Sequence, residues 1–185
     1  GINPNIKIVG VQTANIPSMQ ESMKNGEVTT AFKSTTIADG IAVKTPGDVT
    51  FEIINELVDE VVVVEEDEIA QGMLFLMENQ KVVAEGAGAV TTAALLSGKY
   101  VPKKDENVVC VISGGNVDVN TLYRVIGTAL TKEARRYSFN TVIQDKPGGL
   151  AELTKIISEY DANILSANLS RSSMGGALGS LTAEM

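Results

Sequence analysis

The chain has 185 residues, of which 21% are charged and 44% hydrophobic, and its formal net charge is -8. That balance is typical of a folded globular protein, the negative charge speaks against nucleic acid or an anionic membrane as partner, and no apolar run approaches the roughly 20 residues of a bilayer-spanning helix. The single cysteine, Cys110, excludes a disulfide within one chain, and the absence of histidine excludes Ser–His or Cys–His catalysis and histidine-based zinc sites within it.

The first 80 residues alternate apolar runs with helical patterns. Residues 6–11 and 60–64 predict buried strands, and the four valines of the second suit a central parallel strand covered on both faces. A third helix follows Glu66-Asp67-Glu68, since an acidic first turn favours the positive end of the helix dipole. The predicted helices cover residues 17–25, 47–57 and 66–80.

The next stretch repeats this alternation up to about residue 134. It predicts a short strand at residues 82–83 and a buried strand at residues 107–112. It also predicts helices at residues 90–96 and 120–134. Strands and helices in alternation with short connections indicate an α/β fold with a parallel sheet. Ligands of such sheets bind beyond the carboxyl ends of the strands. Ser113-Gly114-Gly115-Asn116 lies at such an end.

Three segments are candidates for a ligand site. Two glycines after Ser113 allow a ligand to approach the backbone, although an ordinary Gly-Gly turn between strand and helix is the commoner explanation for this segment alone. Glu85-Gly86-Ala87-Gly88-Ala89 could cradle an anion at a helix start, or reflect close helix packing with Glu85 as a cap. Thr35-Thr36-Ile37-Ala38-Asp39-Gly40 by itself indicates only a loop with a capped turn.

Together, in this order and spacing, the segments resemble the threonine dehydratase and serine racemase branch of the fold-type-II pyridoxal phosphate enzymes. The resemblance runs from Asn3 to about Thr131 and is nearest to the catabolic type of threonine ammonia-lyase. It also includes Gly10-Val11-Gln12, Asn55-Glu56-Leu57-Val58-Asp59 and Glu66-Asp67-Glu68-Ile69. It implies that residues 1–134 are the C-terminal portion of a catalytic domain with a tryptophan-synthase-β-like parallel sheet. The implied reaction converts L-threonine to 2-oxobutanoate and ammonia.

The resemblance also implies roles for single residues around pyridoxal 5'-phosphate. Ser113 contacts the pyridine nitrogen, and its neutral hydroxyl leaves that nitrogen largely unprotonated, which β-elimination tolerates. Gly40 and Gly114 allow the backbone to approach the ring, and Glu85 lines the pocket near its edge.

Parts of the family's machinery are not expected in this chain. The resemblance places the Schiff-base lysine and the phosphate loop upstream of Gly1, so we assign no catalytic residue and expect the isolated chain to be inactive. Lys33 follows a similar phenylalanine but lacks the arginine–glycine that should come next, and we reject it. Residues 12–18 contain no acid, so we predict no carboxylate metal site of the kind some relatives have, which counts against a serine racemase.

After a predicted boundary at residues 132–136 the character of the sequence changes. Residues 135–171 resemble the start of an α+β, ferredoxin-like ACT domain, with strands at 137–143 and 163–169 and a helix at 150–160. The candidate effector residues lie in its first loop and are Asp145, Gly148, Gly149 and Leu150. A generic βαβ piece with a Pro-Gly turn is the alternative. Residues 172–185 show no strand alternation, so we expect the third strand to be missing and this tail to be poorly ordered.

Several alternatives stay open. The substrate can be L-serine in place of L-threonine, as in a serine dehydratase or racemase, and the chain can instead be a non-catalytic amino-acid sensor. The resemblance implies a cytoplasmic homodimer or homotetramer when full length, a link to isoleucine biosynthesis, and an amino acid or nucleotide as effector. No membrane partner is expected.

Overall fold

The computed structural model describes residues 3–32, 35–144, 146–171 and 177–184. The chain divides into two units, residues 1–129 and 130–185, and the division lies within helix α5 (Val119–Lys132). Within the described residues, no helix is both long and apolar enough to cross a bilayer.

A parallel pair of strands forms the centre of the first unit. β1 (Val9–Thr13) pairs with β2 (Glu60–Val64), with Val9 opposite Glu60 and Thr13 opposite Val64. β1 begins later than predicted, because Ile6 and Ile8 stay exposed and outside the ladder. β2 has the predicted bounds, but only Val64 in it is buried, so the expected cover on both faces is incomplete. In the described part of the chain the two strands pair only with each other.

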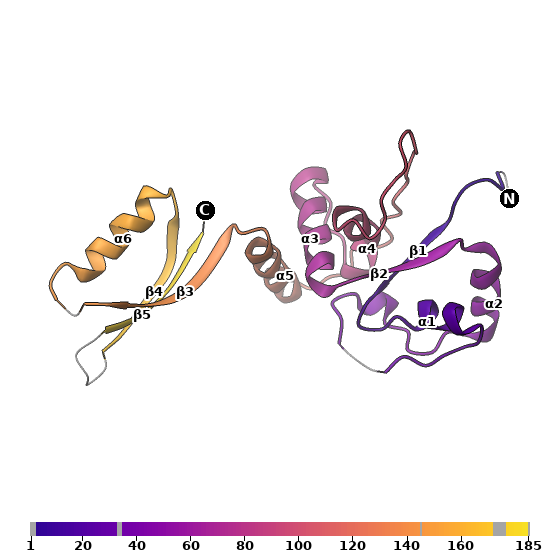
Figure 1. The fold of residues 1–185 in the computed structure, drawn as a ribbon, viewed down its shortest axis with the longest axis horizontal. Coiled ribbons are helices and arrows are strands. Elements are labelled where there is room, and N and C mark those ends of the chain that lie inside the picture. Colours follow the sequence, from indigo (N-terminus) through magenta and orange to yellow (C-terminus); the bar gives the residue numbers. More distant parts are fainter. Residues whose placement is uncertain (1–2, 33–34, 145, 172–176, 185) are drawn as a thin grey trace. The chain divides into compact units, whose positions relative to one another are not determined.

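Helices lie on both sides of this pair (Figure 1). α1 contacts β2 and α2, whereas α4 contacts both strands and packs along α3. α1 ends at Gly26, whose φ of 75° is the left-handed conformation that favours glycine. α3 begins with a capping box of Glu65 and Glu68, and its first turn is acidic as predicted. The helical elements are α1 (Ser18–Asn25), η1 (Asp39–Ile41), α2 (Asp48–Leu57), α3 (Glu66–Phe75), the single π-turn η2 (Leu76–Gln80) and α4 (Gly86–Leu96).

The contact between α3 and α4 is built from small side chains. Gly72 of α3 allows close approach, since a Cβ placed there would lie 3.0 Å from the carbonyl oxygen of Ala89 and 3.1 Å from the Cβ of Ala93. Ile69 and Met73 of α3 are almost fully buried beside this contact and supply the larger apolar surface of the core. The packing holds the first turn of α4 in a defined place.

Two predicted strands of this unit are absent. Residues 82–83 and 107–112 carry no strand ladder, and Val109 and Val111 are 86% and 67% exposed. The prediction of a short strand at residues 82–83 and of a buried strand at residues 107–112 is therefore wrong. Their β-branched composition suits a strand, but no neighbouring strand in the described residues supplies hydrogen bonds, and no element covers these valines.

The second unit is an antiparallel sheet with one helix on it. β3 (Arg136–Ile143) and β4 (Asn163–Arg171) lie on either side of β5 (Ala177–Glu184), and α6 (Gly149–Glu159) contacts β3 and β4. Ile157 of α6 is buried against a small apolar group: Leu153, Ala162 and Ile164.

The third strand of this sheet corrects the sequence interpretation. The expectation that no strand follows Arg171 is wrong, because the backbone of residues 177–184 pairs with β3 on one edge and β4 on the other. Pairing on both edges compensates for a sequence without clear alternation. The rest of that expectation, for residues 172–176 and 185, lies outside the described residues.

Candidate functional site

The glycine-rich stretch at residues 85–89 forms the first turn of α4, and two loops press against it. A Cβ added to Gly86 would lie 2.7 Å from the carbonyl carbon of Ile37, and one added to Gly88 would lie 2.7 Å from the carbonyl oxygen of Gly114. Cβ atoms essentially never come that close to another backbone. The two glycines are therefore explained by close packing, and this contact brings the three predicted segments together.

Glu85 lies at the centre of this meeting point. Its backbone occupies the N-cap position of α4, but its side chain makes no capping hydrogen bond, so the cap explanation for this glutamate does not hold. Its amide donates to the carbonyl oxygen of Gly114 over 3.1 Å. Its carboxyl carbon lies 2.9 Å from the Cβ position of Gly114, and its Oε1 lies 3.7 Å from that of Gly40. Two of the other three predicted cofactor residues, Gly40 and Gly114, thus border the Glu85 carboxylate.

Ser113, the fourth, precedes Gly114 and is exposed. The segment before it is held to α4 by Thr91, whose hydroxyl donates to the carbonyl oxygen of Val111 over 3.2 Å and whose carbonyl oxygen lies 3.7 Å from the Cys110 thiol. Ser113 therefore carries an exposed hydroxyl next to Gly114, on a segment that Thr91 attaches to α4.

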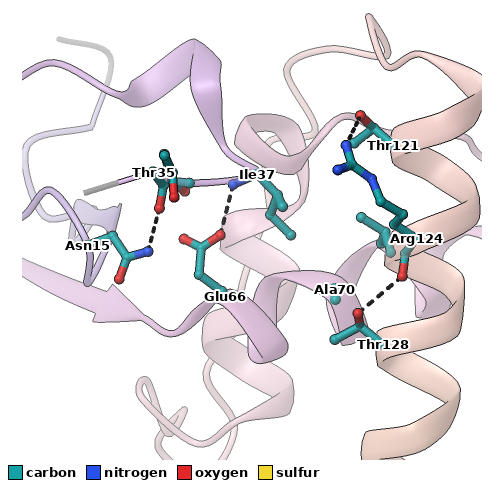
Figure 2. Close-up of a pocket in the computed structure, with 10 residues that line it drawn as sticks. Asn15, Thr35, Ile37, Glu66, Ala70, Thr121, Arg124 and Thr128 are labelled. Carbon is teal, nitrogen blue, oxygen red and sulfur yellow. Dashed lines mark hydrogen bonds between the residues drawn. The ribbon is translucent and has the colours of Figure 1, made fainter. Parts of the chain in front are cut away.

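A hydrogen-bond network below this point was not predicted. Glu66, in the first turn of α3, accepts the hydroxyl of Thr13 on Oε1 over 3.0 Å and the amide of Ile37 on Oε2 over 2.8 Å (Figure 2). The Thr36 hydroxyl donates to that of Thr13 over 3.2 Å and accepts the amide of Ala38 over 3.1 Å. These residues come from three separate elements, and no local pattern links them.

The same network forms one wall of a cavity of about 460 Å³. Asn15 closes it on the strand side by donating to the carbonyl oxygen of Thr35 over 2.6 Å, and α5 provides the opposite wall (Figure 2). On α5, Arg124 donates to the Thr121 hydroxyl over 3.2 Å. The cavity is lined by Asn15, Thr35, Thr36, Ile37, Glu66, Ala70, Thr121, Arg124, Val125 and Thr128.

Asp118 stands at the start of α5 and accepts the Thr121 amide over 2.9 Å. Hydrogen bonds from the hydroxyl and then the amide of Thr121 lower the pKa of this carboxyl below its usual 3.8. The charged form therefore stabilises the first turn of the helix that follows the Ser113 segment.

A second polar cluster lies away from this site. Lys7 pairs with Glu60 over 3.3 Å and lies 4.9 Å from the centre of the Tyr100 ring, whose hydroxyl donates to Glu106 over 2.9 Å. The hydrogen bond to Glu106 raises the pKa of Tyr100, while the amide of Lys103 and then the Tyr100 hydroxyl lower the pKa of Glu106. The cluster attaches the loop after α4 to the segment before β1.

The candidate effector residues belong to the second unit. Gly148 is the N-cap of α6 with a φ of 93°, so the tight turn itself calls for glycine there. Gly149 is buried as the first residue of α6, and Leu150 is partly exposed. Asp145 and the rejected Lys33 lie outside the described residues. Among the described residues no group of three or more acidic or cysteine side chains could hold a metal ion.

Known proteins match this chain over most of its length. The family described as pyridoxal-phosphate dependent enzyme matches residues 1–114. The L-threonine ammonia-lyase of Thermotoga maritima is 47% identical over 184 residues, which is 100% of this chain and 45% of that protein. This chain therefore spans less than half the length of that relative.

Solved structures of related enzymes also match this chain. Threonine deaminase isoform 2 from Solanum lycopersicum matches with a TM-score of 0.62 and 33% identity over 69% of this chain and 38% of that one. Maize serine racemase matches with a TM-score of 0.59 and 31% identity over 72% of this chain and 41% of that one.

Proposed function

This chain belongs to the pyridoxal-phosphate dependent enzyme family, and from that premise we propose that it is part of a threonine ammonia-lyase. The reaction is the conversion of L-threonine to 2-oxobutanoate and ammonia. Identity of 47% to an L-threonine ammonia-lyase along the whole chain supports this choice of substrate.

The residues present fit the family's cofactor. Gly40 and Gly114 carry no side chain beside the Glu85 carboxylate, and a Cβ on Gly114 would lie 2.9 Å from the Glu85 carboxyl carbon. A flat ring that must come close to backbone needs such positions. The exposed hydroxyl of Ser113, next to Gly114, is a neutral group that can donate or accept one hydrogen bond.

In the proposed mechanism each residue has a limited task. When bound, pyridoxal phosphate is the electron sink that makes loss of the α-proton and the β-hydroxyl possible. Ser113 would hold the pyridine nitrogen, Gly40 and Gly114 would admit the ring, and Glu85 would accept hydrogen bonds at its edge. The base that takes the α-proton is assigned to no residue of this chain.

The observation that carries the proposal is the convergence on Glu85. Gly40, Glu85 and Gly114 are separated by 45 and 29 positions, yet both glycines border the same carboxylate. Helix capping does not explain that glutamate, since its side chain makes no capping hydrogen bond. The Glu85 side chain packs against Gly114 and lies near Gly40, so three residues that the family resemblance assigns to the cofactor meet at one place.

The test uses the protein with its natural upstream coding sequence restored. We expect it to bind pyridoxal phosphate, seen as visible absorbance, and to release 2-oxobutanoate from threonine. Ser113→Asp places a fixed negative charge at the ring nitrogen and lowers kcat/KM about tenfold or more. Asn116→Asp adds the same charge three residues further on and is the matched control. Equal loss in both variants, or no cofactor absorbance in the unsubstituted protein, would contradict the proposal.

L-serine is the second candidate substrate, supported by the match to a serine racemase. The same preparation distinguishes the two, because the pyruvate formed from serine and the 2-oxobutanoate formed from threonine are separable. A kcat/KM greater with serine would reassign the substrate within the family. Formation of D-serine would identify a racemase.

For the second unit we propose an ACT-like regulatory role. Its support is the strand order β3-β5-β4, in which the third strand separates the first two as the resemblance implies. The effector, an amino acid or a nucleotide, would bind near Gly148, Gly149 and Leu150. We further propose a cytoplasmic homodimer or homotetramer linked to isoleucine biosynthesis. Effector titrations and light scattering of the longer protein test these points.

A further inference from the structure

The peptide of Ile37 is held from two sides. Its amide donates to Glu66 Oε2 over 2.8 Å, and its carbonyl group faces the first turn of α4, where a Cβ on Gly86 would lie 2.7 Å from the carbonyl carbon. One side of this clamp is therefore a carboxylate from α3, and the other is the backbone of α4. Figure 2 shows the Glu66 side chain turned toward the amide.

The neighbouring hydroxyls are ordered by the same carboxylate. Ala38 donates its amide to Thr36, Thr36 donates its hydroxyl to Thr13, and Thr13 donates its hydroxyl to Glu66 Oε1. Every donor in this relay points toward Glu66, because an ionised carboxylate only accepts hydrogen bonds. Thr13 is fully buried, so this orientation is not exchanged for water at that point.

The clamped segment leads directly to Gly40. Ile37 and Ala38 precede the short turn η1 (Asp39–Ile41), and a Cβ on Gly40 in that turn would lie 3.1 Å from the Cβ of Ala87 and 3.7 Å from Glu85 Oε1. A change in the orientation of the Ile37 peptide therefore moves Gly40 relative to Glu85.

We propose that Glu66 is a positioning residue for the cofactor site, holding the turn at Gly40 against Glu85 through the Ile37 amide and the Thr13–Thr36 hydroxyl relay. This inference rests on the proposed function. Glu66 takes no part in the chemistry, and it acts on how tightly and in what orientation the cofactor is held.

The experiment uses the longer protein with its upstream sequence and compares Glu66→Ala, Glu66→Gln and Glu65→Gln. Glu66→Ala removes both acceptors, and we expect the Kd for pyridoxal phosphate to rise about tenfold, as loss of a hydrogen bond to a charged group predicts. The visible circular dichroism of the bound cofactor should fall with it at saturating cofactor, because the ring environment changes. Glu66→Gln keeps one oxygen for the Ile37 amide, and we expect binding within about threefold of the unsubstituted protein. Glu65→Gln removes a charge from the adjacent, exposed residue and should change neither readout.

The outcomes separate the two proposals. If the unsubstituted protein binds no pyridoxal phosphate, the proposed function fails. If it binds the cofactor and Glu66→Ala binds it equally well with an unchanged dichroism signal, only the role of Glu66 is overturned. Weaker binding in Glu66→Gln to the same extent as in Glu66→Ala would also overturn it, because charge rather than the Ile37 hydrogen bond would then be responsible.

Discussion

The first turn of α4 and the segment at residues 107–112 border the same candidate site but are held in place very differently. At Gly86 and Gly88 the backbones of two loops touch the helix, with no room for a Cβ. At Val109 and Val111 most of each side chain is exposed, and the attachments to α4 run through Thr91. Substitutions of similar size should therefore have very different effects on the two sides.

This difference shows which side of the candidate site is held in place by contacts within the described residues and which side is not. The side formed by Gly40, Glu85 and Ile37 is defined by backbone packing and buried hydrogen bonds. The side that carries Ser113 has no ladder within the described residues to fix its register. The following predictions test that contrast by urea unfolding of the 185-residue chain.

The largest effect is expected from Gly86→Val. Its Cβ would meet the Ile37 carbonyl group, so either α4 or the loop must move, which costs about 3 kcal/mol or more of unfolding free energy. Gly86→Ala adds only the Cβ and should already destabilise. A Gly86→Ala variant as stable as the unsubstituted chain would show that the loop at Ile37 moves easily. The first turn of α4 would then be no more tightly held than the segment at residues 107–112.

Thr13→Val tests the buried hydroxyl relay. The Thr13 hydroxyl donates to Glu66 and accepts from Asn15 and Thr36, so an isosteric apolar replacement leaves buried partners unsatisfied and should cost about 2 kcal/mol. Thr30→Val is the control, because the Thr30 hydroxyl bonds that of Thr45 at the surface. An equal loss of unfolding free energy in the two variants would show that the buried hydroxyl relay contributes no more to stability than a surface hydrogen bond.

Asp118 gives a smaller effect that depends on pH. The Thr121 hydroxyl and amide lower its pKa in the folded chain below 3.8, so its stabilisation is present at neutral pH and is lost as the pH falls through that lowered value. Asp118→Ala should therefore be less stable than the unsubstituted chain at pH 7, with the gap closing under more acidic conditions. A stability difference that stays constant on acidification would mean that the charge of Asp118 contributes nothing. Asp118→Asn removes the charge but keeps an oxygen that can accept the Thr121 amide, so it separates the two contributions.

The smallest effect is expected from Val109→Thr. Its side chain is 86% exposed, so the change should stay within about 0.5 kcal/mol in the 185-residue chain. The same substitution in the longer protein sharpens the comparison. A loss above about 1 kcal/mol there would mean that additional polypeptide covers this valine.

Local signals in the sequence were sufficient for much of the fold. Gly26 marks the end of α1, and the valine run predicts β2 with its observed bounds. α4 begins at Gly86, earlier than the predicted residue 90, because packing against Ile37 and Gly114 overrides the low helix propensity of glycine. The strands at 82–83 and 107–112 could not be predicted correctly, because strand formation depends on a partner that composition does not reveal.

Some residues of the candidate site could be predicted from the sequence, and others could not. Gly40, Glu85 and Gly114 were named from a family resemblance, and the structure brings these three around one point. The contact between Glu66 and Thr13 was not predicted, because it joins residues 53 positions apart. A glutamate in a first helical turn already has an ordinary explanation in the helix dipole. Only tertiary structure distinguishes the two uses of that side chain.

The position of β5 has a consequence for the order of folding during synthesis. Arg136 pairs with Glu184, and Asn163 pairs with the same glutamate from the other side, so β3 and β4 are joined through β5, which is synthesised after both of them. Loop closure over such separations slows sheet formation. Until β5 has emerged and paired, β3 and β4 have exposed edges, and this is the stage at which the nascent unit is most open to pairing with another chain or to capture by a chaperone.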